Sequence, residues 1–412
     1  MRVLRHRDAI STPSRDGFPH HVRAEVARIL EQVSDGGDAA VLTLTERFDH
    51  AELGPDQLRV HPNELDASVG VLPPDVLNGL RTAIANVRAV AKAQVRDDPV
   101  TVELPQGHTV EVAEEAVRRA AIYVPGGRAP YPSTVVMGAV TARAAGVAEI
   151  VVCAPPGPGG RAHPVILAAC VLCEVTEVYR MGGAQAIAAL AFGTESVQPV
   201  DVIVGPGNPY VQEAKRQVVG QVGIDGVAGP SELAIVASSG ADTELIALDL
   251  LAQAEHGSDS PLWCVSPDPS LLDAVAAALE PRAEGRDREA ELIDTSDLES
   301  ALRIAELIAP EHLELVGAEA EALADRVRNA GCLFVGAGAG TAFGDYVAGS
   351  NHVLPTGGAA RFQSALSPAT FRRRMARVSL PGEAPARLAP AGAALARAEG
   401  FPVHAESMER RA

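Results

Sequence analysis

Short apolar runs alternate with alanine-rich stretches from about residue 119 onward, and turns rich in glycine and proline separate the two. The first four apolar runs occupy residues 120–124, 150–153, 175–179 and 201–204. Strand, turn and helix repeated in this order are typical of a parallel β-sheet that helices cover. This repetition constrains the fold more strongly than any other feature of the chain.

The same rhythm returns after residue 232. Apolar runs at residues 233–236, 262–265 and 312–316 precede expected helices at 243–255, 271–279 and 318–329, and a further run follows at 332–335. We therefore predict two α/β units with parallel sheets. A duplication would account for two such units, but the halves are too dissimilar in sequence to establish one.

The two ends of the chain lack this rhythm. Residues 18–100 show the helical spacing of apolar residues, beginning with Val22, Val26, Ile29 and Leu30. After the glycines at 357–358 the pattern stops, and residues 359–412 form a tail that lacks the apolar pattern of a core of its own. The prediction is an α/β protein with a helical N-terminal segment and an extended C-terminal tail.

Charge and cysteine content exclude several classes of protein. The formal net charge is −18, and such a surface repels phosphate backbones and anionic lipids, so we expect no nucleic-acid or membrane partner. No apolar run approaches the ~20 residues that span a bilayer, and no signal peptide is visible. Five cysteines do not make a disulfide framework, so the cytoplasm is the expected compartment. The pair Cys170 and Cys173 is expected on a buried helix face.

Four places along the chain combine side chains that bind metals or transfer protons. They are Gln253 with His256 on one face of a helical turn, the adjacent Glu311 and His312, Asp345 with His352 after a glycine-rich turn, and Glu399 with His404 in the tail. Each has a plainer explanation: a helix C-cap, an exposed loop pair, a surface loop and a solvated tail, respectively. No GxGxxG, Walker A or HExxH motif occurs, so spacing alone predicts no nucleotide.

These places lie in or after a series of blocks whose wording and order resemble the histidinol dehydrogenase family. The blocks are YVPGGRAPYPST at 123–134, MGGAQAIA at 181–188, GPGNPY at 205–210, GPSE at 229–232, QAEHG at 253–257, PEHLEL at 310–315, and residues 344–356. The resemblance covers roughly residues 20–405, and so many blocks in family order make it highly specific.

The resemblance implies a role for each candidate residue. It implies a zinc site, with manganese as an acceptable substitute, formed by Gln253, His256, Asp345 and His404. The implied catalytic residues are Glu311 and His312. The implied substrate contacts are Ser231, Gln253, His256, His312, Asp345, His352, Glu399 and His404. The implied NAD contacts are Tyr123, Gln185 and Asn208.

The resemblance also implies an architecture. It predicts two incomplete Rossmann-like units and a homodimer in which each tail completes the partner's site. We therefore divide the chain into an N-terminal arm (1–20), a first α/β domain (21–118 with 232–358) that carries most metal and catalytic residues, a second α/β domain (119–231) with the NAD contacts, and the tail (359–412).

The implied reaction is the oxidation of L-histidinol to L-histidine, through a bound aldehyde, in the last steps of histidine biosynthesis. Four electrons leave one carbon, so two NAD⁺ are needed per turnover. One base, His312, serves both steps as an imidazole that is neutral near pH 7, and Glu311 helps water to add between them. Two alternatives remain: a zinc- and NAD-dependent dehydrogenase of another small alcohol, such as a sulfonated diol, and a non-catalytic protein that binds zinc or imidazole compounds.

Overall fold

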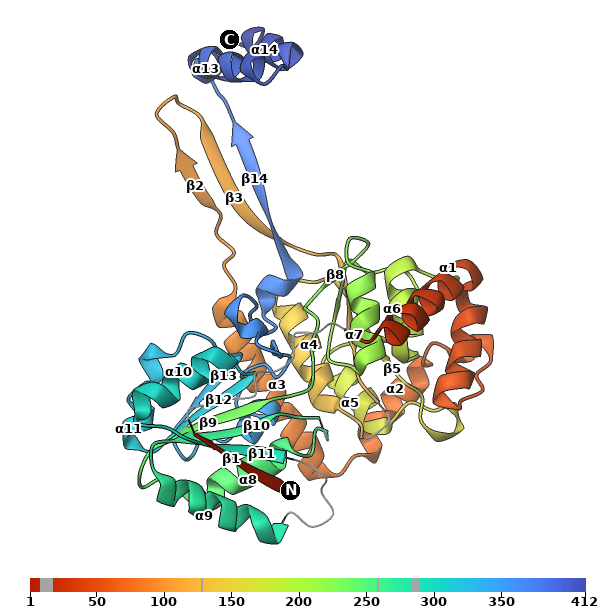
Figure 1. The fold of residues 1–412 in the computed structure, drawn as a ribbon. Coiled ribbons are helices and arrows are strands. Elements are labelled where there is room, and N and C mark those ends of the chain that lie inside the picture. The colour runs from red at the N-terminus through yellow and green to blue at the C-terminus, as the bar shows by residue number, and fades with distance from the viewer. Residues whose placement is uncertain (8–17, 127–128, 258, 283–288) are drawn as a thin grey trace.

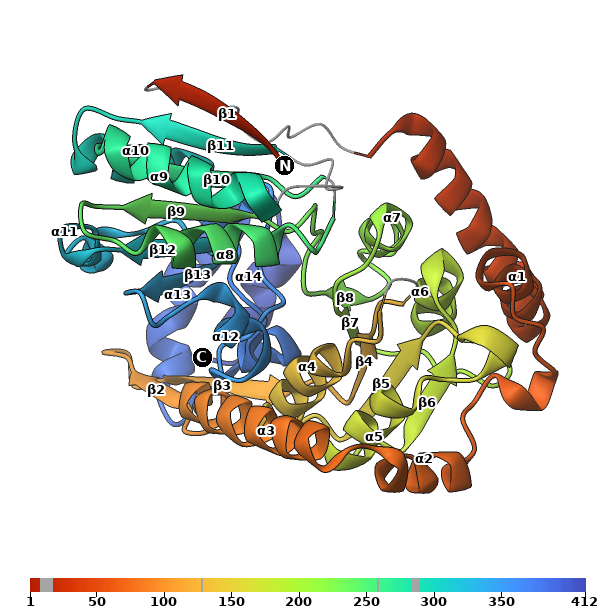
Figure 2. The same cartoon turned by 90° about the horizontal axis from the view of Figure 1, so that it is seen from below.

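A computed structural model of the 412-residue chain describes residues 1–7, 18–126, 129–257, 259–282 and 289–412. Two parallel sheets, each covered by helices, form the body, and an antiparallel three-stranded sheet projects from it with two helices at its tip (Figures 1 and 2). The predicted α/β class is confirmed. Gly127 and Arg128, in the first of the matching blocks, lie outside the described residues.

The first sheet has the strand order of a Rossmann fold that lacks its last strand. Its five strands run parallel in the order β6-β5-β4-β7-β8, which is 3-2-1-4-5 along the chain. The strands are β4 (Arg119–Tyr123), β5 (Glu149–Ala154), β6 (Glu177–Arg180), β7 (Val202–Val204) and β8 (Gly223–Ile224). The connecting helices are α4 (Pro132–Ala144), α5 (Pro164–Leu172), α6 (Gly183–Phe192) and α7 (Pro209–Gln217).

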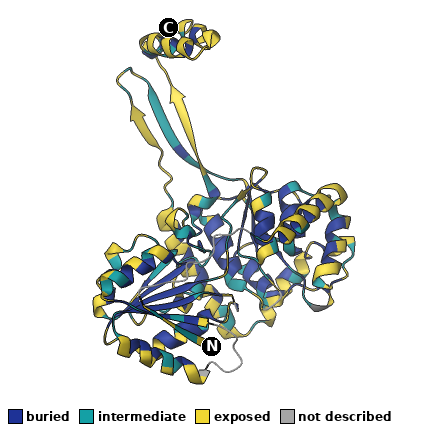
Figure 3. Ribbon diagram, viewed as in Figure 1, coloured by how far each residue is buried: buried dark blue, intermediate teal, exposed yellow. Residues whose placement is uncertain are grey.

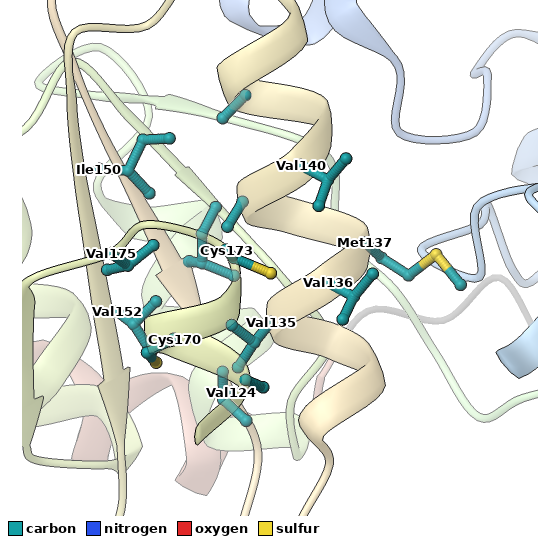
Figure 4. Close-up of a cluster of buried hydrophobic side chains, with 14 of the residues drawn as sticks. Val124, Val135, Val136, Met137, Val140, Ile150, Val152, Cys170, Cys173 and Val175 are labelled. Atoms are coloured by element: carbon teal, nitrogen blue, oxygen red, sulfur yellow. The ribbon is translucent and has the colours of Figure 1, made fainter. Parts of the chain in front are cut away.

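Apolar side chains cover both faces of this sheet, as a buried parallel sheet requires. Along β4, Ala120 and Ile122 point into one core, while Ala121 and Tyr123 point into the other. The first core includes Cys170 and Cys173, which lie among valines around α4 and α5 (Figure 4). Their predicted burial is therefore confirmed, and all five cysteines of the chain are free thiols.

The N-terminal helices complete these two cores. They are α1 (His20–Asp49), α2 (Pro62–Ser68) and α3 (Pro74–Gln94). Helix α1 packs on α6 and α7, whereas α2 and α3 pack on α4 and α5. Residues 20–94 thus pack with residues 119–231, and this differs from the expected grouping with residues 232–358. Helical periodicity predicts that one face is buried but does not indicate which sheet covers it.

The second sheet repeats the same strand order and adds one strand. Its order is β1-β11-β10-β9-β12-β13, with every pair parallel. Apart from β1, its strands are β9 (Leu233–Ala237), β10 (Leu262–Ser266), β11 (Glu289–Asp294), β12 (His312–Val316) and β13 (Cys332–Val335). Helices α8 (Thr243–Gln253) and α9 (Pro269–Leu279) cover one face, and α10 (Leu298–Ile308) and α11 (Ala318–Glu321) cover the other. Two incomplete Rossmann-like units are therefore confirmed.

The beginning of the chain is a strand of this second sheet. Strand β1 (Arg2–Arg7) pairs with β11 in parallel, from Arg2 opposite Glu289 to Arg7 opposite Asp294. The expected N-terminal arm is therefore wrong for these residues, and residues 8–17 lie outside the described part of the chain. A charged edge strand carries little of the apolar pattern that marks a buried strand, which explains why the sequence did not reveal it.

The projecting sheet joins two distant parts of the sequence. Its order is β14-β3-β2, formed by β2 (Val100–Glu103), β3 (Thr109–Ala116) and β14 (Arg372–Ser379). At its tip, α13 (Ala384–Ala398) and α14 (Pro402–Glu409) pack on each other over three buried alanines. Much of the projecting sheet and of the two helices at its tip is exposed (Figure 3). No helix of the described chain is long and apolar enough to cross a membrane.

Candidate active site

Opposite ends of the two sheets line one cleft. Open parallel sheets bind ligands at the carboxyl ends of their strands, and the five-stranded sheet follows this rule with Gly205, which comes directly after β7. The six-stranded sheet contributes its amino ends, because Ser231 precedes β9 and Glu311 precedes β12. All three residues line a cavity of about 430 Å³ between the sheets. Gly205, Ser231 and Glu311 therefore gather where the two units meet.

Strand pairing brings Glu311 next to Ser231. Strands β9 and β12 are neighbours, with His312 opposite Leu233, so the residues just before each strand lie side by side. The Ser231 hydroxyl donates to Glu311 Oε2 at 2.5 Å, and the main-chain N–H of Glu232 donates to the same oxygen at 2.9 Å. The side chains of Glu311 and His312 are only 8% and 3% exposed, so an exposed loop pair is excluded.

The surroundings of Glu311 favour its neutral form. Burial raises the pKa of this carboxyl above its ordinary value, although His312 and the two hydrogen-bond donors oppose the rise. A carboxyl group with a raised pKa can exchange protons with water under mild conditions. This property suits the water-activating role that the sequence predicted.

Main-chain contact fixes the orientation of His312. Its Nδ1 lies 2.9 Å from the carbonyl oxygen of Glu232, which only accepts, so Nδ1 carries a proton. Its Nε2 faces Asp345 Oδ1 at 3.6 Å. Burial lowers the pKa of His312, but the carboxylates of Glu311 and Asp345 outweigh burial and raise this pKa to about 9. In the chain alone the imidazole therefore holds a proton at pH 7, contrary to the neutral imidazole expected from the sequence.

Three of the four predicted metal ligands come from neighbouring elements. Gln253 Nε2 donates to Ser231 Oγ at 2.5 Å, while Gln253 Oε1 is buried without a hydrogen-bond partner. His256 Nε2 lies 3.9 Å from Asp345 Oδ2. An amide oxygen, an imidazole and a carboxylate form a donor set that suits zinc or manganese. In the described part of one chain, no three His, Cys, Asp or Glu side chains gather to hold a metal.

Asp345 belongs to the short helix α12 (Thr341–Tyr346). Its side chain lies among histidines from other parts of the chain. Burial would raise its pKa, but the charges of His312, His352 and His256 outweigh burial and lower it. His352 Nδ1 donates to the main-chain oxygen of Asp345 at 2.9 Å, and its Nε2 lies 3.3 Å from Thr134 Oγ1. Burial lowers the pKa of His352, which keeps its Nε2 available as an acceptor.

The predicted NAD contacts lie at the carboxyl edge of the five-stranded sheet. The Tyr123 hydroxyl accepts from the Gly183 N–H at 3.1 Å, and Gln185 Nε2 lies 3.5 Å from Asp49 Oδ2. Gln185 Oε1 is buried and has no hydrogen-bond partner. Asn208 Oδ1 instead caps α7 by accepting from the N–H groups of residues 210 and 211. Asn208 lines the cleft, whereas Tyr123 and Gln185 are almost fully buried behind it.

The two predicted tail residues lie far from this cleft in the same chain. Glu399 caps the end of α13 and His404 belongs to α14, both at the tip of the projecting sheet (Figure 1). Both side chains are exposed, and the His404 ring lies 5.3 Å from the Phe401 ring, centroid to centroid. One chain therefore does not bring all the predicted residues together.

Two sets of contacts around the cleft were not predicted. Lys215 Nζ donates to the Gly205 carbonyl at 2.9 Å and pairs with Asp225 Oδ1 at 2.5 Å, while Asp225 Oδ2 accepts from the Gly205 N–H at 2.7 Å. A lysine in an amphipathic helix usually faces solvent, so the sequence carried no signal for this clamp. Glu232 holds both Glu311 and His312, and its only signal was its place at the end of the GPSE block.

Comparison with known proteins identifies the family. The histidinol dehydrogenase family model matches residues 14–412. Histidinol dehydrogenases from Parasynechococcus marenigrum and Cereibacter sphaeroides are each 44% identical over 400 residues, which cover 95% of this chain and 91% and 92% of theirs. The crystal structure of histidinol dehydrogenase from Elizabethkingia anophelis aligns with a TM-score of 0.92 and 30% identity, and it covers 100% of this chain and 98% of that one. The chain therefore belongs to the histidinol dehydrogenase family.

Proposed function

We propose that this chain oxidises L-histidinol to L-histidine in two NAD-dependent steps, with the intermediate aldehyde held in the cleft. The observation that carries the proposal is the buried couple of Glu311 and His312, with His312 facing Asp345, in a chain of this family. The relatives named above are histidinol dehydrogenases. No observation favours another small alcohol or a non-catalytic role.

Zinc is proposed at Gln253, His256 and Asp345, with His404 of a second copy as the fourth ligand. The support from geometry is Gln253 Oε1, because a buried acceptor without a partner is costly unless something binds it. Bound zinc would hold the imidazole and amino nitrogens of the substrate and thereby fix the reacting carbon. Manganese is an acceptable replacement at these N and O donors.

NAD⁺ is proposed at the carboxyl edge of the five-stranded sheet. The amide oxygen of Gln185 is again a buried acceptor without a partner. Gly205 allows this loop to lie against β4, since a Cβ there would lie 2.1 Å from the Tyr123 carbonyl oxygen. When bound, NAD⁺ accepts the hydride in each step, and Tyr123, Gln185 and Asn208 are the residues proposed to orient it.

Each step removes one hydride and one proton. His312 Nε2 takes the hydroxyl proton as the first hydride leaves the carbon and releases it to solvent, Glu311 then helps water add to the aldehyde, and His312 takes a proton from the gem-diol as the second hydride leaves. A cation bound at Asp345 would weaken the support that this carboxylate gives to the imidazolium, which would lower the pKa of His312 and favour its neutral form. That change allows the imidazole to serve as the base.

A homodimer with shared sites is proposed because the cleft of one chain lacks Glu399 and His404. The tip exposes Leu395, Phe401 and Val403, with 66%, 53% and 73% of their surface accessible, and apolar tips of this kind favour burial against a partner. Docking of each tip on the other body would bring both residues to the partner's substrate and metal. We keep the cytoplasm as the proposed compartment, because all five cysteines are free thiols.

The proposal is tested by adding histidinol and NAD⁺ to the purified protein and following NADH absorbance. We expect two NADH per histidinol, histidine as the product and no free aldehyde. Prolonged chelation should abolish turnover, and added zinc should restore it. One NADH per histidinol would contradict the two-step mechanism, and full activity in protein shown to contain no metal would contradict the zinc site.

A further inference from the structure

Glu232 contacts more of the catalytic machinery than any role assigned above requires. It comes directly before β9, is 1% exposed, and lies between the two sheets' contributions to the cleft. Its main-chain N–H donates to Glu311 Oε2 at 2.9 Å, and its carbonyl oxygen accepts from His312 Nδ1 at 2.9 Å. The backbone of a single residue thus holds both catalytic side chains, at Glu311 Oε2 and at His312 Nδ1.

The side chain of Glu232 fixes that backbone in place. Its Oε2 accepts from the Glu311 N–H at 3.3 Å, and its Oε1 accepts from the Gly357 N–H at 2.8 Å. The first bond connects the residue before β9 to the residue before β12, beside the main-chain bond that the His312 N–H donates to the Glu232 carbonyl oxygen at 3.3 Å. The second connects them to the loop of Thr356, which lines the cleft. One carboxylate therefore joins the starts of β9 and β12 to the loop at Gly357.

We propose that Glu232 is a positioning residue whose carboxylate sets the relative placement of Glu311, His312 and the loop at Thr356 and Gly357. The inference rests on the proposed function, because placement matters only if these groups react with a bound alcohol. Both oxidations use His312, so misplacement slows both. Substrate and NAD⁺ are bound mainly by other residues, so their affinities stay nearly unchanged.

The carboxylate also has a purely structural explanation, in which it only satisfies two buried N–H groups. The two explanations predict different properties for a folded variant in which this carboxylate is replaced. A structural role lowers the melting temperature and leaves kcat of the folded protein unchanged. A positioning role lowers kcat in the folded protein, since misplacement of catalytic groups by a fraction of an ångström to 1 Å costs up to ~10²-fold in rate.

The test is the Glu232→Gln variant, which keeps the shape of the side chain but offers one acceptor oxygen for two N–H donors. We expect kcat to fall by about 10- to 100-fold for both histidinol and histidinaldehyde, with KM for each substrate and for NAD⁺ within about threefold of wild type. Glu232→Asp keeps the charge but is too short to reach both donors, and we expect the same pattern with it.

The matched control is Glu177→Gln. Glu177 also accepts several hydrogen bonds, from Arg119 and Tyr179, but at the amino edge of the five-stranded sheet, away from the cleft. This variant should lose melting temperature and keep wild-type kcat. A folded Glu232→Gln with wild-type kcat overturns the inference. If that variant does not fold, wild-type kcat in Glu232→Asp overturns it. An inactive wild type would instead overturn the proposed function.

Discussion

Glu311 and His312 are adjacent in the sequence, yet their contacts suit them to different steps. Glu311 is held by Ser231 and by main-chain N–H, whereas His312 faces Asp345 through Nε2. We expect His312→Ala to lower the rates of both half-reactions by about 10²- to 10⁴-fold. Glu311→Gln should lower overall histidinol oxidation strongly and spare the hydride step from supplied aldehyde hydrate. The two rates are measured as NADH formation from histidinol and as NADH formation from histidinaldehyde. Equal losses in both assays for Glu311→Gln would contradict the assigned roles.

Glu314, in the middle of β12, makes stability depend on pH. Its Oε1 accepts from the Thr341 N–H at 2.9 Å, its Oε2 is buried without a hydrogen-bond partner, and burial, with the charge of Asp249, raises its pKa to about 8. Because the folded pKa lies above the ordinary 4.5, the fold favours the protonated carboxyl. The stabilisation is complete below about pH 4.5 and is lost as the pH rises to about 8.

Glu314→Gln should remove this dependence, because the amide oxygen still accepts from Thr341 and carries no charge. Relative to wild type, the variant should gain stability between pH 5 and pH 9, by about 1.4 kcal/mol for each pKa unit of the shift. Melting temperatures of both proteins across this range provide the measurement. A difference between them that does not change with pH would show that Glu314 does not titrate in the fold.

At the scale of elements, the loop between β7 and α7 depends on the close approach of two backbones. Gly205 has a φ of +125°, and a Cβ there would lie 2.1 Å from the Tyr123 carbonyl oxygen. Gly205→Ala must therefore push the loop away from β4, and we expect NAD⁺ affinity to fall at least about tenfold, the effect of ~1.4 kcal/mol, with histidinol affinity preserved. Calorimetric titration of each ligand measures both.

Gly220→Ala is the control for this loop. Gly220 also has a positive φ, +99°, but a Cβ there meets nothing within 4 Å. It should share the backbone strain of Gly205→Ala and lose some stability, while NAD⁺ binding remains normal. If the two variants lose NAD⁺ affinity equally, strain is the cause and the contact with Tyr123 is not.

The elements also show what the sequence could and could not predict. Strands such as β4, β9 and β10 are apolar on both faces, so short apolar runs between turns located them. Strands β2, β3 and β14 are largely exposed or half-buried, and β14 pairs with β3 across more than 200 residues, so the apolar pattern did not reveal the projecting sheet. The expected helix at 318–329 ends at Glu321, with only a further 3₁₀ turn at Ala324–Arg326.

At the scale of the whole molecule, the cleft is made where the carboxyl ends of one sheet face the amino ends of the other. The resemblance predicted the residues of the site, and strand pairing explains why Ser231 and Glu311 meet. The resemblance also predicted that each tail completes the partner's site, and within one chain the projecting sheet does hold α14, with His404, away from the body that carries His256. The position of the tip leads to the claim that two copies build each site.

The most direct test mixes two inactive variants, His256→Ala and His404→Ala, by refolding them together and measuring histidinol-dependent NADH formation. If the site is shared, each mixed dimer has one cleft with both His256 and His404 and one cleft with neither. Random pairing makes half the dimers mixed, so about a quarter of wild-type activity should return. If each tail serves its own cleft, every site keeps one lesion. No recovery in a sample that demonstrably contains mixed dimers would contradict the shared site.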